Sequence, residues 1–375
     1  MLYKQFQDKQ LSSLGLGLMR LPIIDNDETQ IDIDKAAEMV DYAIKNGINY
    51  FDTAWGYHGG NSEIVAGQLL RKYPRDSYYI ASKFPGYDLN NMDKVEEIFE
   101  KQLEKTGMEY FDFYMLHNVC ELNVNQYLDD EKYGIIPYLL KQKELGRIKH
   151  LGFSSHARLR TMKKFLDKVG EHMEFCQIQL NWLDWDFQKG GEKYKLLKAR
   201  NIPAFVMEPL RGGKLANLPE DRATVLKDLR PDESIAAWGF RFLQSLDYIP
   251  VVLSGMSTME QLKENIETMS ERKRLTDKEG MVLMYAASGL VDPVPCTECR
   301  YCTTHCPLGL DIPMLLSLYN EHNANENDFI STMTIESLAE NKRPSACINC
   351  KSCEDVCPQR IRISEFLADL AEAIE

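Results

Sequence analysis

The sequence contains no long apolar run. No window approaches about 18 uninterrupted apolar residues, and the first ten residues, MLYKQFQDKQ, lack the hydrophobic stretch of a secretory signal. A helix that crosses a membrane needs about 20 predominantly apolar residues. We therefore expect a soluble, cytoplasmic protein without a membrane partner.

The sequence is also poor in positive charge. It has 44 Lys and Arg residues against 57 Asp and Glu residues, which gives a formal net charge of −13. A nucleic-acid partner would favour a basic face, so this balance argues against one. The acidic residues are unevenly spread: from Val291 onward the net charge is −8, which leaves −5 for the much longer N-terminal part.

Cysteine is scarce in most of the chain. Residues 1–290 contain only Cys120 and Cys176, whereas the remaining residues contain eight cysteines. A disulfide framework belongs to secreted chains, and we do not expect this chain to be secreted. The eight form two copies of Cys-x2-Cys-x2-Cys-x3-Cys-Pro, CTECRYCTTHCP at 296–307 and CINCKSCEDVCP at 347–358. We therefore expect these thiols to bind metal, and we call the two copies the first and second cassettes.

The cassette spacing is the bacterial [4Fe–4S] pattern, in which three cysteines hold one cluster and the fourth ligates the other. Zinc is the alternative, because paired Cys-x2-Cys motifs bind it, but zinc does not need four thiolates in this rhythm. Two complete copies make chance a poor explanation. The rule predicts two ligand sets, which are Cys296, Cys299, Cys302 and Cys357 for one cluster and Cys347, Cys350, Cys353 and Cys306 for the other.

The segments around the cassettes are predicted to be helical. The residues between the cassettes are too many for a compact duplicated ferredoxin, and we read them as helix. Apolar residues recur there at helical spacing, and again after the second cassette. These stripes are Ile312, Leu315, Leu316 and Tyr319 behind the candidate cap Asp311, and Ile363, Phe366, Leu367, Leu370 and Ile374. Residues 289–375 are therefore predicted to be a small helical ferredoxin-like domain with two clusters.

Residues 1–288 show eight alternations of a short β-rich run with a helical segment. The runs end near Arg20, Thr53, Lys83, Asn118, Ser155, Asn181, Pro209 and Gly255, and helical segments include 34–45, 62–70, 93–103 and 259–268. This size and order are those of an α/β protein with a (β/α)8 TIM barrel. A doubly wound open sheet is the alternative. Against it, no Gly-x-Gly-x-x-Gly links a strand to a helix, since GLGLMR has arginine in place of the third glycine.

Barrel enzymes place their chemistry at the C-terminal ends of the strands, where this sequence has Asp52, Tyr57, Lys83 and His117. Each residue alone has a structural explanation, such as a loop cap or a buried histidine. Together they suit proton donation to a carbonyl oxygen by Tyr57, whose pKa a nearby ammonium would lower. Asp52 would hold Lys83 charged and in place, and His117 could donate a hydrogen bond to the substrate oxygen.

The motifs FDTAWGY, ASK and MLHN, in this order and at these strand ends, resemble the Asp-Tyr-Lys-His tetrad of the aldo-keto reductases. LGLGLMRLP, GFSSH, QIQLNW, MEPLRGGKL and GMSTMEQLKEN resemble that family as well. The similarity covers roughly residues 3–285, and the tail resembles a ferredoxin-fused branch of the family. The resemblance implies a reductase with a nicotinamide cofactor extended across the barrel mouth.

The resemblance also implies which residues contact the cofactor. These are Ser154, Ser155 and Gln179 at the carboxamide, Met207 at the nicotinamide ring, the loop Arg211, Gly212, Gly213 and Lys214 over the pyrophosphate with Leu210 before it, and Glu264 and Asn265 near the adenine.

Some positions depart from the family pattern. Met207 stands where an aromatic ring often stacks on the nicotinamide, although a thioether also packs on rings. Ser155 stands where many members have asparagine, and Gly255 and Gln261 stand where basic residues usually hold the 2′-phosphate. The candidates to replace those basic residues are Arg211, Lys214 and Lys263. NADP(H) is the first expectation, with NAD(H) and a flavin as alternatives.

The predicted reaction is hydride transfer from the cofactor to a small aldehyde or ketone, or the reverse from an alcohol, with Tyr57 as the proton donor. The two [4Fe–4S] clusters would relay single electrons or stabilise the tail. Two other classes compete: an electron-transfer protein whose clusters feed a flavin or a partner, and a redox or oxygen sensor on a barrel scaffold. The complete tetrad favours the enzyme. For a relay, the −8 charge of the tail predicts an electron-transfer partner with a basic surface.

Overall fold

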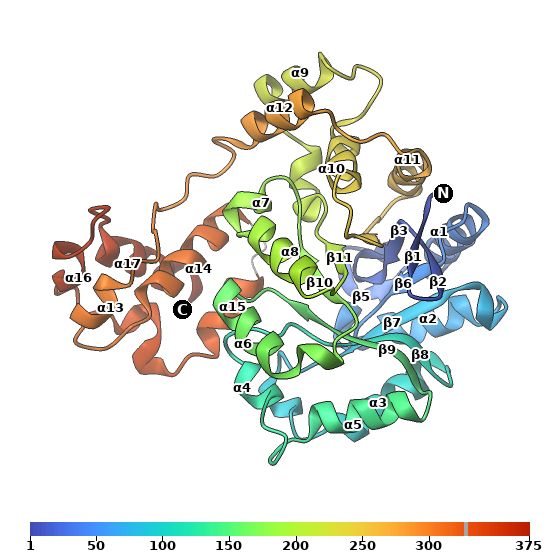
Figure 1. Cartoon of the computed structure of the whole chain (residues 1–375), viewed down its shortest axis with the longest axis horizontal. Coiled ribbons are helices and arrows are strands. Elements are labelled where there is room, and N and C mark those ends of the chain that lie inside the picture. Colours follow the sequence, from blue (N-terminus) through green and yellow to red (C-terminus); the bar gives the residue numbers. More distant parts are fainter. Residues whose placement is uncertain (326–328) are drawn as a thin grey trace. The chain divides into compact units, whose positions relative to one another are not determined.

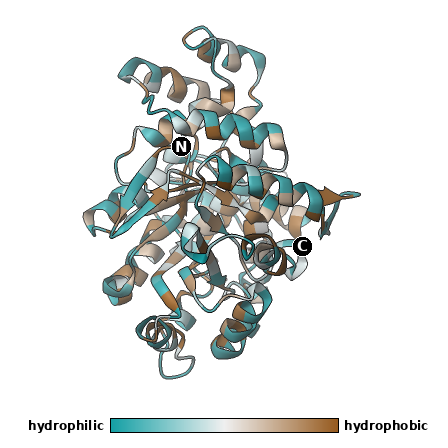
Figure 2. Ribbon diagram, turned by 90° about the vertical axis from the view of Figure 1, so that its right-hand side faces the viewer, coloured by the Kyte–Doolittle hydropathy of each residue, from teal (hydrophilic) through white to brown (hydrophobic). Residues whose placement is uncertain are grey.

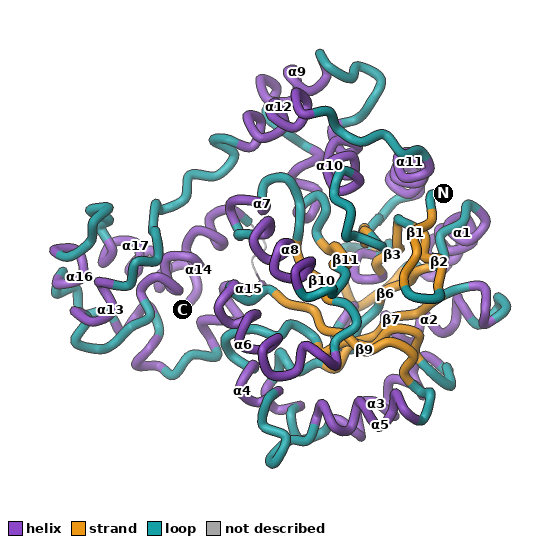
Figure 3. Tube along the Cα trace, viewed as in Figure 1, coloured by secondary structure: helices purple, strands orange, loops and turns teal. Residues whose placement is uncertain are grey.

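The computed structural model describes residues 1–325 and 329–375 and divides into two compact units, Met1–Ala286 and Ala287–Glu375 (Figure 1). Within the described residues, every strand belongs to the first unit, whereas the second consists of helices and loops (Figure 3). No helix in the described part of the chain combines the length and the apolar content needed to span a bilayer.

The first unit is built around a closed barrel of eight strands, each hydrogen-bonded in parallel to both neighbours. In barrel order the strands are β3 (Leu14–Gly17), β6 (Tyr50–Asp52), β7 (Tyr79–Phe84), β8 (Phe111–Leu116), β9 (Ile148–Ser155), β10 (Cys176–Gln179), β11 (Ala204–Met207) and β12 (Val252–Ser254). Most of their side chains are buried, as expected for parallel strands covered on both faces. The prediction of a (β/α)8 barrel is confirmed.

A helix follows each barrel strand before the next one begins (Figure 3). These helices are α1 (Ile33–Lys45), α2 (Ser62–Leu70), α3 (Val95–Thr106), α5 (Ile135–Glu144), α6 (Leu159–Val169), α8 (Gly190–Ala199), α10 (Ile235–Gln244) and α11 (Met259–Ser270). Additional elements lie in the connections, namely β4 (Ile23–Ile24), β5 (Asp27–Ile31), α4 (Val124–Tyr127), α7 (Asp184–Phe187), α9 (Glu220–Lys227) and α12 (Asp277–Ala287).

Helix α1 illustrates why these segments are helical. The Asp32 side chain caps it by accepting a hydrogen bond from the backbone N–H of Lys35 at 3.1 Å. Residues three and four apart then form one buried stripe, which consists of Ala36, Met39, Val40 and Ala43. The mixture of hydrophilic and hydrophobic residues along such helices is visible in Figure 2. The apolar stripe faces the barrel and holds the strands in place.

An N-terminal hairpin of β1 (Tyr3–Phe6) and β2 (Lys9–Ser12) closes the end of the barrel at which the strands begin. The Phe6 ring is buried, with its centroid 5.4 Å from that of Phe113 and 5.5 Å from that of Phe205. These rings belong to an aromatic core inside the barrel. The accessible end is therefore the opposite one, where the strands end.

The second unit is a small helical domain, as the sequence predicts. Its helices are α13 (Tyr301–His305), α14 (Ile312–Ala324), α15 (Phe329–Glu336), α16 (Ser352–Asp355) and α17 (Ile363–Ile374). The apolar stripes of α14 and α17 meet in one core, in which the Tyr319 and Phe366 rings are 5.0 Å apart. Asp311 caps α14 through the N–H of Met314. Residues 326–328, within the segment read as helix, lie outside the described residues.

Candidate active site and cluster sites

The four residues of the predicted tetrad lie at the open end of the barrel. Asp52 is the last residue of β6, and Lys83 is the penultimate residue of β7. His117 follows the end of β8, and Tyr57 begins the short 3-10 helix η2 (Tyr57–Gly60) in the loop after β6. Three neighbouring strands thus bring a carboxylate, an ammonium, an imidazole and a phenol to one mouth.

Lys83 joins three of these groups. Its buried ammonium lies 2.6 Å from Asp52 Oδ1, 2.7 Å from the carbonyl oxygen of Thr53 and 3.3 Å from Tyr57 Oη. Burial is the largest influence and acts to lower the pKa of Lys83, but the charges and hydrogen bonds of Asp52 and Tyr57 together outweigh it, and the pKa is raised. Lys83 is therefore a fixed positive charge beside the phenol.

The pKa of Tyr57 corrects the sequence expectation. We expected Lys83 to lower it, and Lys83 does act in that direction, but burial dominates and raises the pKa of Tyr57 above its usual value. Removing the phenol from water disfavours the phenolate more than the ammonium favours it. Tyr57 therefore holds its proton at neutral pH, as a proton donor must.

His117 completes the group as a neutral imidazole. Its ring centroid lies 6.0 Å from that of Tyr57, and its buried Nδ1 has no hydrogen-bond partner among the described residues. Burial holds the pKa of His117 well below its usual value, and the charge of Lys83 lowers it further. A neutral imidazole offers one N–H donor, and a polar substrate atom in this mouth could satisfy the ring.

A buried hydrogen-bond network lies behind Lys83. Glu63 of α2 is fully buried and accepts hydrogen bonds from Ser82 and Gln102 at 2.6 Å and from Lys105 at 2.8 Å. Gln102 also donates to the backbone carbonyl of Lys83 at 3.0 Å. The network fixes the backbone that carries the catalytic candidate, because every buried polar group in it has a partner.

The residues assigned to the carboxamide lie at the ends of β9 and β10, but the scaffold already engages their side chains. The Ser154 hydroxyl accepts the N–H of Asn118 at 2.8 Å, and the Ser155 hydroxyl donates to the carbonyl of Val119 at 2.7 Å. The Gln179 amide donates to Asp184 at 2.8 Å. These contacts position the three side chains and leave each with further hydrogen-bonding capacity.

Arg211 departs from its expected role over the pyrophosphate. Its guanidinium is buried and forms an ion pair with Asp184, which is also buried. Separating a buried ion pair destabilises the protein, because it leaves one charge buried without a partner. Arg211 is therefore not available to bind a phosphate. The loop around it, the 3-10 helix η6 (Arg211–Ala216), has positive φ at Gly212 and Gly213, which only glycine adopts readily.

The other assigned residues border the same end of the barrel. Met207 ends β11, and its sulfur accepts from Gln177 at 3.6 Å. Leu210 precedes η6, and Lys214 is exposed within it. In the middle of α11, Glu264 accepts a hydrogen bond from Ser234, and Asn265 donates one to Ser254 at 3.3 Å. The Lys263 ammonium lies 5.6 Å from the centre of the Tyr42 ring.

Arg20, which ends the 3-10 helix η1 (Leu18–Arg20) after β3, is not among the residues predicted from the sequence. A Cβ placed on Gly212 would lie 3.3 Å from Arg20 Nη2, and one placed on Gly255 would lie 3.1 Å from Arg20 Cδ. The exposed guanidinium has no hydrogen-bond or ion-pair partner within the described part of the chain. One sequence feature could have drawn attention to Arg20: in GLGLMR it stands where the Gly-x-Gly-x-x-Gly motif has its third glycine.

Tyr87 was also missed. Its ring centroid is 5.0 Å from that of His117 at an interplanar angle of 90°, and its hydroxyl lies beside Gly56. Burial raises the pKa of Tyr87 to about 12. Tyr87 thus packs against His117 and lies beside the residue that precedes Tyr57.

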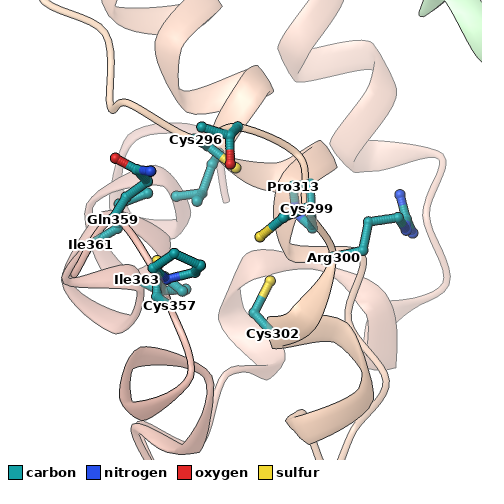
Figure 4. Close-up of a pocket in the computed structure, with 12 residues that line it drawn as sticks. Cys296, Cys299, Arg300, Cys302, Pro313, Cys357, Gln359, Ile361 and Ile363 are labelled. Atoms are coloured by element: carbon teal, nitrogen blue, oxygen red, sulfur yellow. The ribbon is translucent and has the colours of Figure 1, made fainter.

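The cysteines of the first predicted set line one hollow in the second unit, with their sulfur atoms directed toward a common space (Figure 4). They are Cys296, Cys299, Cys302 and Cys357. Much of the remaining lining is apolar and includes Pro313, Leu316, Ile361 and Ile363. The structure therefore combines three thiols of the first cassette with the last thiol of the second.

The reciprocal set lines a second hollow, which contains Cys306, Cys347, Cys350 and Cys353. The two cassettes have the same backbone geometry, because both residues that flank the second cysteine have positive φ. These residues are Glu298 and Arg300 around Cys299, and Asn349 and Lys351 around Cys350. Alternating right- and left-handed backbone directs successive N–H groups into one concavity, a feature of many iron–sulfur sites.

The donor chemistry of both hollows fits [4Fe–4S] clusters. Each offers four thiols in an apolar setting, which is the ligand set of such a cluster. Among residues 1–325 and 329–375, no three Cys, His, Asp or Glu side chains converge closely enough to hold a single metal ion.

Family comparisons match both units. The aldo/keto reductase family model matches residues 13–280, and the 4Fe-4S dicluster domain matches residues 295–361. An uncharacterized oxidoreductase, YqkF, from Bacillus subtilis (strain 168) is 25% identical over 302 residues, or 72% of this chain and 91% of that protein. The NADH-specific methylglyoxal reductase of Escherichia coli (strain K12) is 33% identical over 131 residues, or 29% of this chain and 39% of that protein.

Solved structures share the barrel fold. The holo form of aldo-keto reductase AKR11C1 from Bacillus halodurans aligns with a TM-score of 0.62 at 24% identity, over 76% of this chain and 96% of that one. An aldo-keto reductase from Klebsiella pneumoniae in complex with NADPH aligns with a TM-score of 0.58 at 18% identity, over 76% and 94% of the two chains.

Proposed function

This chain belongs to the aldo/keto reductase family and carries a C-terminal 4Fe-4S dicluster domain, and from this premise we propose that it reduces a small aldehyde or ketone. Hydride would come from a nicotinamide cofactor, and Tyr57 would give a proton to the carbonyl oxygen. The observation that carries the proposal is the contact of the Lys83 ammonium with both Asp52 and Tyr57. Oxidation of the corresponding alcohol would use the same groups in reverse.

The four side chains would divide the work by their charges. Asp52 keeps Lys83 protonated, and Lys83 would stabilise the charge that develops on the Tyr57 oxygen as its proton leaves. The neutral His117 would donate a hydrogen bond to the carbonyl oxygen and orient it toward Tyr57. Tyr87 would form the wall that sets the size of the substrate.

The cofactor would lie across the open end of the barrel. Ser154, Ser155 and Gln179 would hold the carboxamide, and Arg20 would supply the cation for the phosphates that Arg211 cannot contact. When bound, the nicotinamide ring supplies the hydride. The methylglyoxal reductase is named as NADH-specific and the Klebsiella pneumoniae structure contains NADPH, so these relatives support a nicotinamide over a flavin without selecting NADP(H) or NAD(H).

The eight cassette cysteines would hold two [4Fe–4S] clusters that exchange single electrons with another protein. A hydride carries two electrons together, whereas each cluster exchanges one, so the clusters would serve a second electron path unless a flavin links the two. The exposure of Cys299 and Cys350 supports this role over a purely structural one. An exposed ligand brings the cluster close to a partner protein, whereas a cluster that only stabilises the fold needs no exposed ligand.

Tyr57→Phe tests the reductase proposal. The variant keeps the ring and loses the proton, so we expect carbonyl reduction to fall by about 10²–10⁴-fold while nicotinamide binding is retained. Reduction of a series of small aldehydes should be measured with NADPH and NADH, and cofactor binding by fluorescence titration. Reduction at the wild-type rate by the variant would show that Tyr57 is not the acid. Failure of the wild type to bind either nucleotide would reject the cofactor.

A further inference from the structure

The loop that carries Tyr57 has few contacts of its own to hold it in place. It spans residues 53–61, between β6 and α2. The N–H of Tyr57 donates to the carbonyl of Ala54 at 3.3 Å, and among the residues that the structure describes the Tyr57 hydroxyl has one hydrogen-bond partner, Lys83, at 3.3 Å. After Tyr57 the backbone turns through three consecutive residues with positive φ, which are His58, Gly59 and Gly60. The position of the phenol therefore depends on what packs against the loop.

One charged side chain from outside the loop lies against both of its arms. Lys105, in the last turn of α3, places its ammonium over the Trp55 ring, 4.5 Å from the ring centre, and a Cβ built on Gly60 would lie 3.7 Å from the same nitrogen. The face of an indole attracts an ammonium, and more strongly where water is excluded, as it is around the Lys105 side chain, which is 12% exposed. Lys105 therefore holds the loop two residues before Tyr57 and three residues after it.

Glu63 fixes the position of Lys105. Its carboxylate is fully buried near the start of α2, and its Oε2 lies 2.8 Å from the Lys105 ammonium. Helices α2 and α3 meet backbone to backbone here, since a Cβ built on Gly67 would lie 2.1 Å from the carbonyl oxygen of Thr106. Separating the pair would leave a buried charge without its partner. The Lys105 ammonium is therefore held at one position.

Glu63 is also connected to the hydrogen-bond partner of Tyr57. Its Oε1 accepts a hydrogen bond from Gln102 at 2.6 Å, and Gln102 donates to the backbone carbonyl of Lys83 at 3.0 Å. One buried carboxylate is thus linked to Lys83 through Gln102 and to the loop of Tyr57 through Lys105. The distance from the Lys83 ammonium to the Tyr57 hydroxyl, 3.3 Å, is longer than the other two hydrogen bonds of that ammonium, at 2.6 and 2.7 Å. It is the contact within the tetrad that a shift of the loop would change first.

We propose that Glu63 and Lys105 are positioning residues that set the distance between the Lys83 ammonium and the Tyr57 hydroxyl, with the Trp55 ring as the point of contact. The inference rests on the proposed role of Tyr57 as the proton donor and extends it to residues outside the tetrad. Neither side chain takes part in the reaction, and each acts through Tyr57. A displacement of about 1 Å can reduce the rate of a preorganised site by about 10²-fold, so a loop released from Lys105 should slow proton transfer.

A purely structural role is the alternative, in which the pair of Glu63 and Lys105 only joins α2 to α3. Both roles predict that loss of the pair lowers the melting temperature. They differ in what happens when Tyr57 has already lost its hydroxyl. A positioning effect then has no proton donor to act on, whereas a structural effect persists.

The test combines Lys105→Ala with Tyr57→Phe in the full-length protein. Alanine removes the ammonium and the stem beneath Trp55 while it keeps a good helix former in α3. Lys101→Ala, in the same helix, is the matched control, because Lys101 pairs with Glu104 at 2.8 Å and both side chains are exposed. For each variant, kcat and KM are measured with a small aldehyde and with NADPH and NADH, at enzyme concentrations high enough to follow the Tyr57→Phe protein. Melting temperatures are measured alongside.

We expect Lys105→Ala to lower kcat by about tenfold or more while the KM for the nucleotide changes by less than about twofold. Lys105→Arg should restore most of the rate, since a guanidinium also pairs with a carboxylate and stacks on an aromatic ring. In the Tyr57→Phe background, Lys105→Ala should change the residual rate by less than about twofold. Lys101→Ala should leave kcat unchanged in both backgrounds.

Two results would overturn the proposal. One is a Lys105→Ala variant that melts at a lower temperature but reduces the aldehyde at the wild-type kcat. The other is an equal loss of rate with and without the Tyr57 hydroxyl, which would leave Lys105 a structural role only. If Lys105→Ala does not fold, Trp55→Leu takes its place with the same expectations, because it leaves the pair of Glu63 and Lys105 intact. A wild-type rate in Tyr57→Phe alone would instead reject the proton donor, and the positioning residues with it.

Discussion

The barrel site and the cluster sites are built in opposite ways. In the barrel, the side chains hold one another: Lys83 is fixed by Asp52 and by the Thr53 carbonyl before any cofactor binds. In the second unit, the metal ligands are themselves part of the core, since Cys302 and Cys353 are buried among its apolar residues. The barrel therefore supplies its own geometry, whereas the second unit depends on what its cysteines bind.

This difference follows from the amount of apolar surface each unit can bury. The barrel has a large cluster of buried residues between strands and helices, and a second, smaller cluster inside the barrel. The second unit has one small core. Small domains generally need disulfides or metal to supplement such a core.

Removal of iron should give the largest difference in stability between the two units. After anaerobic chelation we expect residues 287–375 to lose their fold, because the thiols that line the two hollows would no longer be linked. The barrel should keep its structure. Limited proteolysis followed by mass spectrometry should yield a resistant fragment that ends near Ala286. An apo tail that resists protease as well as the holo tail would contradict this view.

Lys83→Met tests whether the ion pair between Lys83 and Asp52 stabilises the barrel site in the absence of a cofactor. It leaves Asp52 buried without its partner, so we expect a loss of stability of about 3–5 kcal/mol together with a fall in carbonyl reduction of at least about 10²-fold.

The double variant Asp52→Asn/Lys83→Met is the matched control, because it removes both charges. Its melting temperature should recover most of the loss while its activity stays low. Recovery of activity in the double variant would show that Lys83 acts only through stability.

A smaller effect should distinguish strained from relaxed positions within the cassettes. Glu298 has a φ of 58°, a conformation that costs a non-glycine residue about 1 kcal/mol or more. Glu298→Gly should therefore raise the stability of the holo tail by up to about 1 kcal/mol, whereas Thr297→Gly next to it should lower it. Chemical denaturation monitored through cluster absorption would measure both. Equal destabilisation by the two substitutions would show that the backbone at Glu298 is not strained.

The smallest expected effect concerns pH. The pKa of His117 is lowered well below its usual value and that of Tyr57 is raised, so neither group changes its protonation across the neutral range. The rate of carbonyl reduction at saturating cofactor should vary by less than about twofold between pH 6 and 8. An inflection near the ordinary histidine pKa of about 6.5 would show that His117 is exposed to titration.

Much of the architecture could be predicted because it depends on local patterns. The strand ends that carry Asp52, Lys83 and His117 follow buried runs, and in a parallel barrel such ends meet at one mouth. The ligand exchange between the cassettes follows from spacing alone, and the structure gathers the thiols in those combinations.

What could not be predicted depends on contacts between distant residues. The inward turn of Arg211 requires Asp184, which comes from a different loop, and the raised pKa of Tyr57 depends on how deeply the fold buries the phenol. Arg20 becomes notable only when two loops more than 190 residues later pass beside it. Sequence periodicity carries no information on such encounters.

The aromatic plug of the barrel has a consequence for the order of events during synthesis. Phe6 is translated 199 residues before its neighbour Phe205. At 5–20 residues per second, that interval is roughly 10–40 s. For this time the N-terminal hairpin has no barrel to enter and exposes an aromatic side chain to chaperones. The hairpin is thus made before the barrel that it closes, yet it is among the last elements that can take their places.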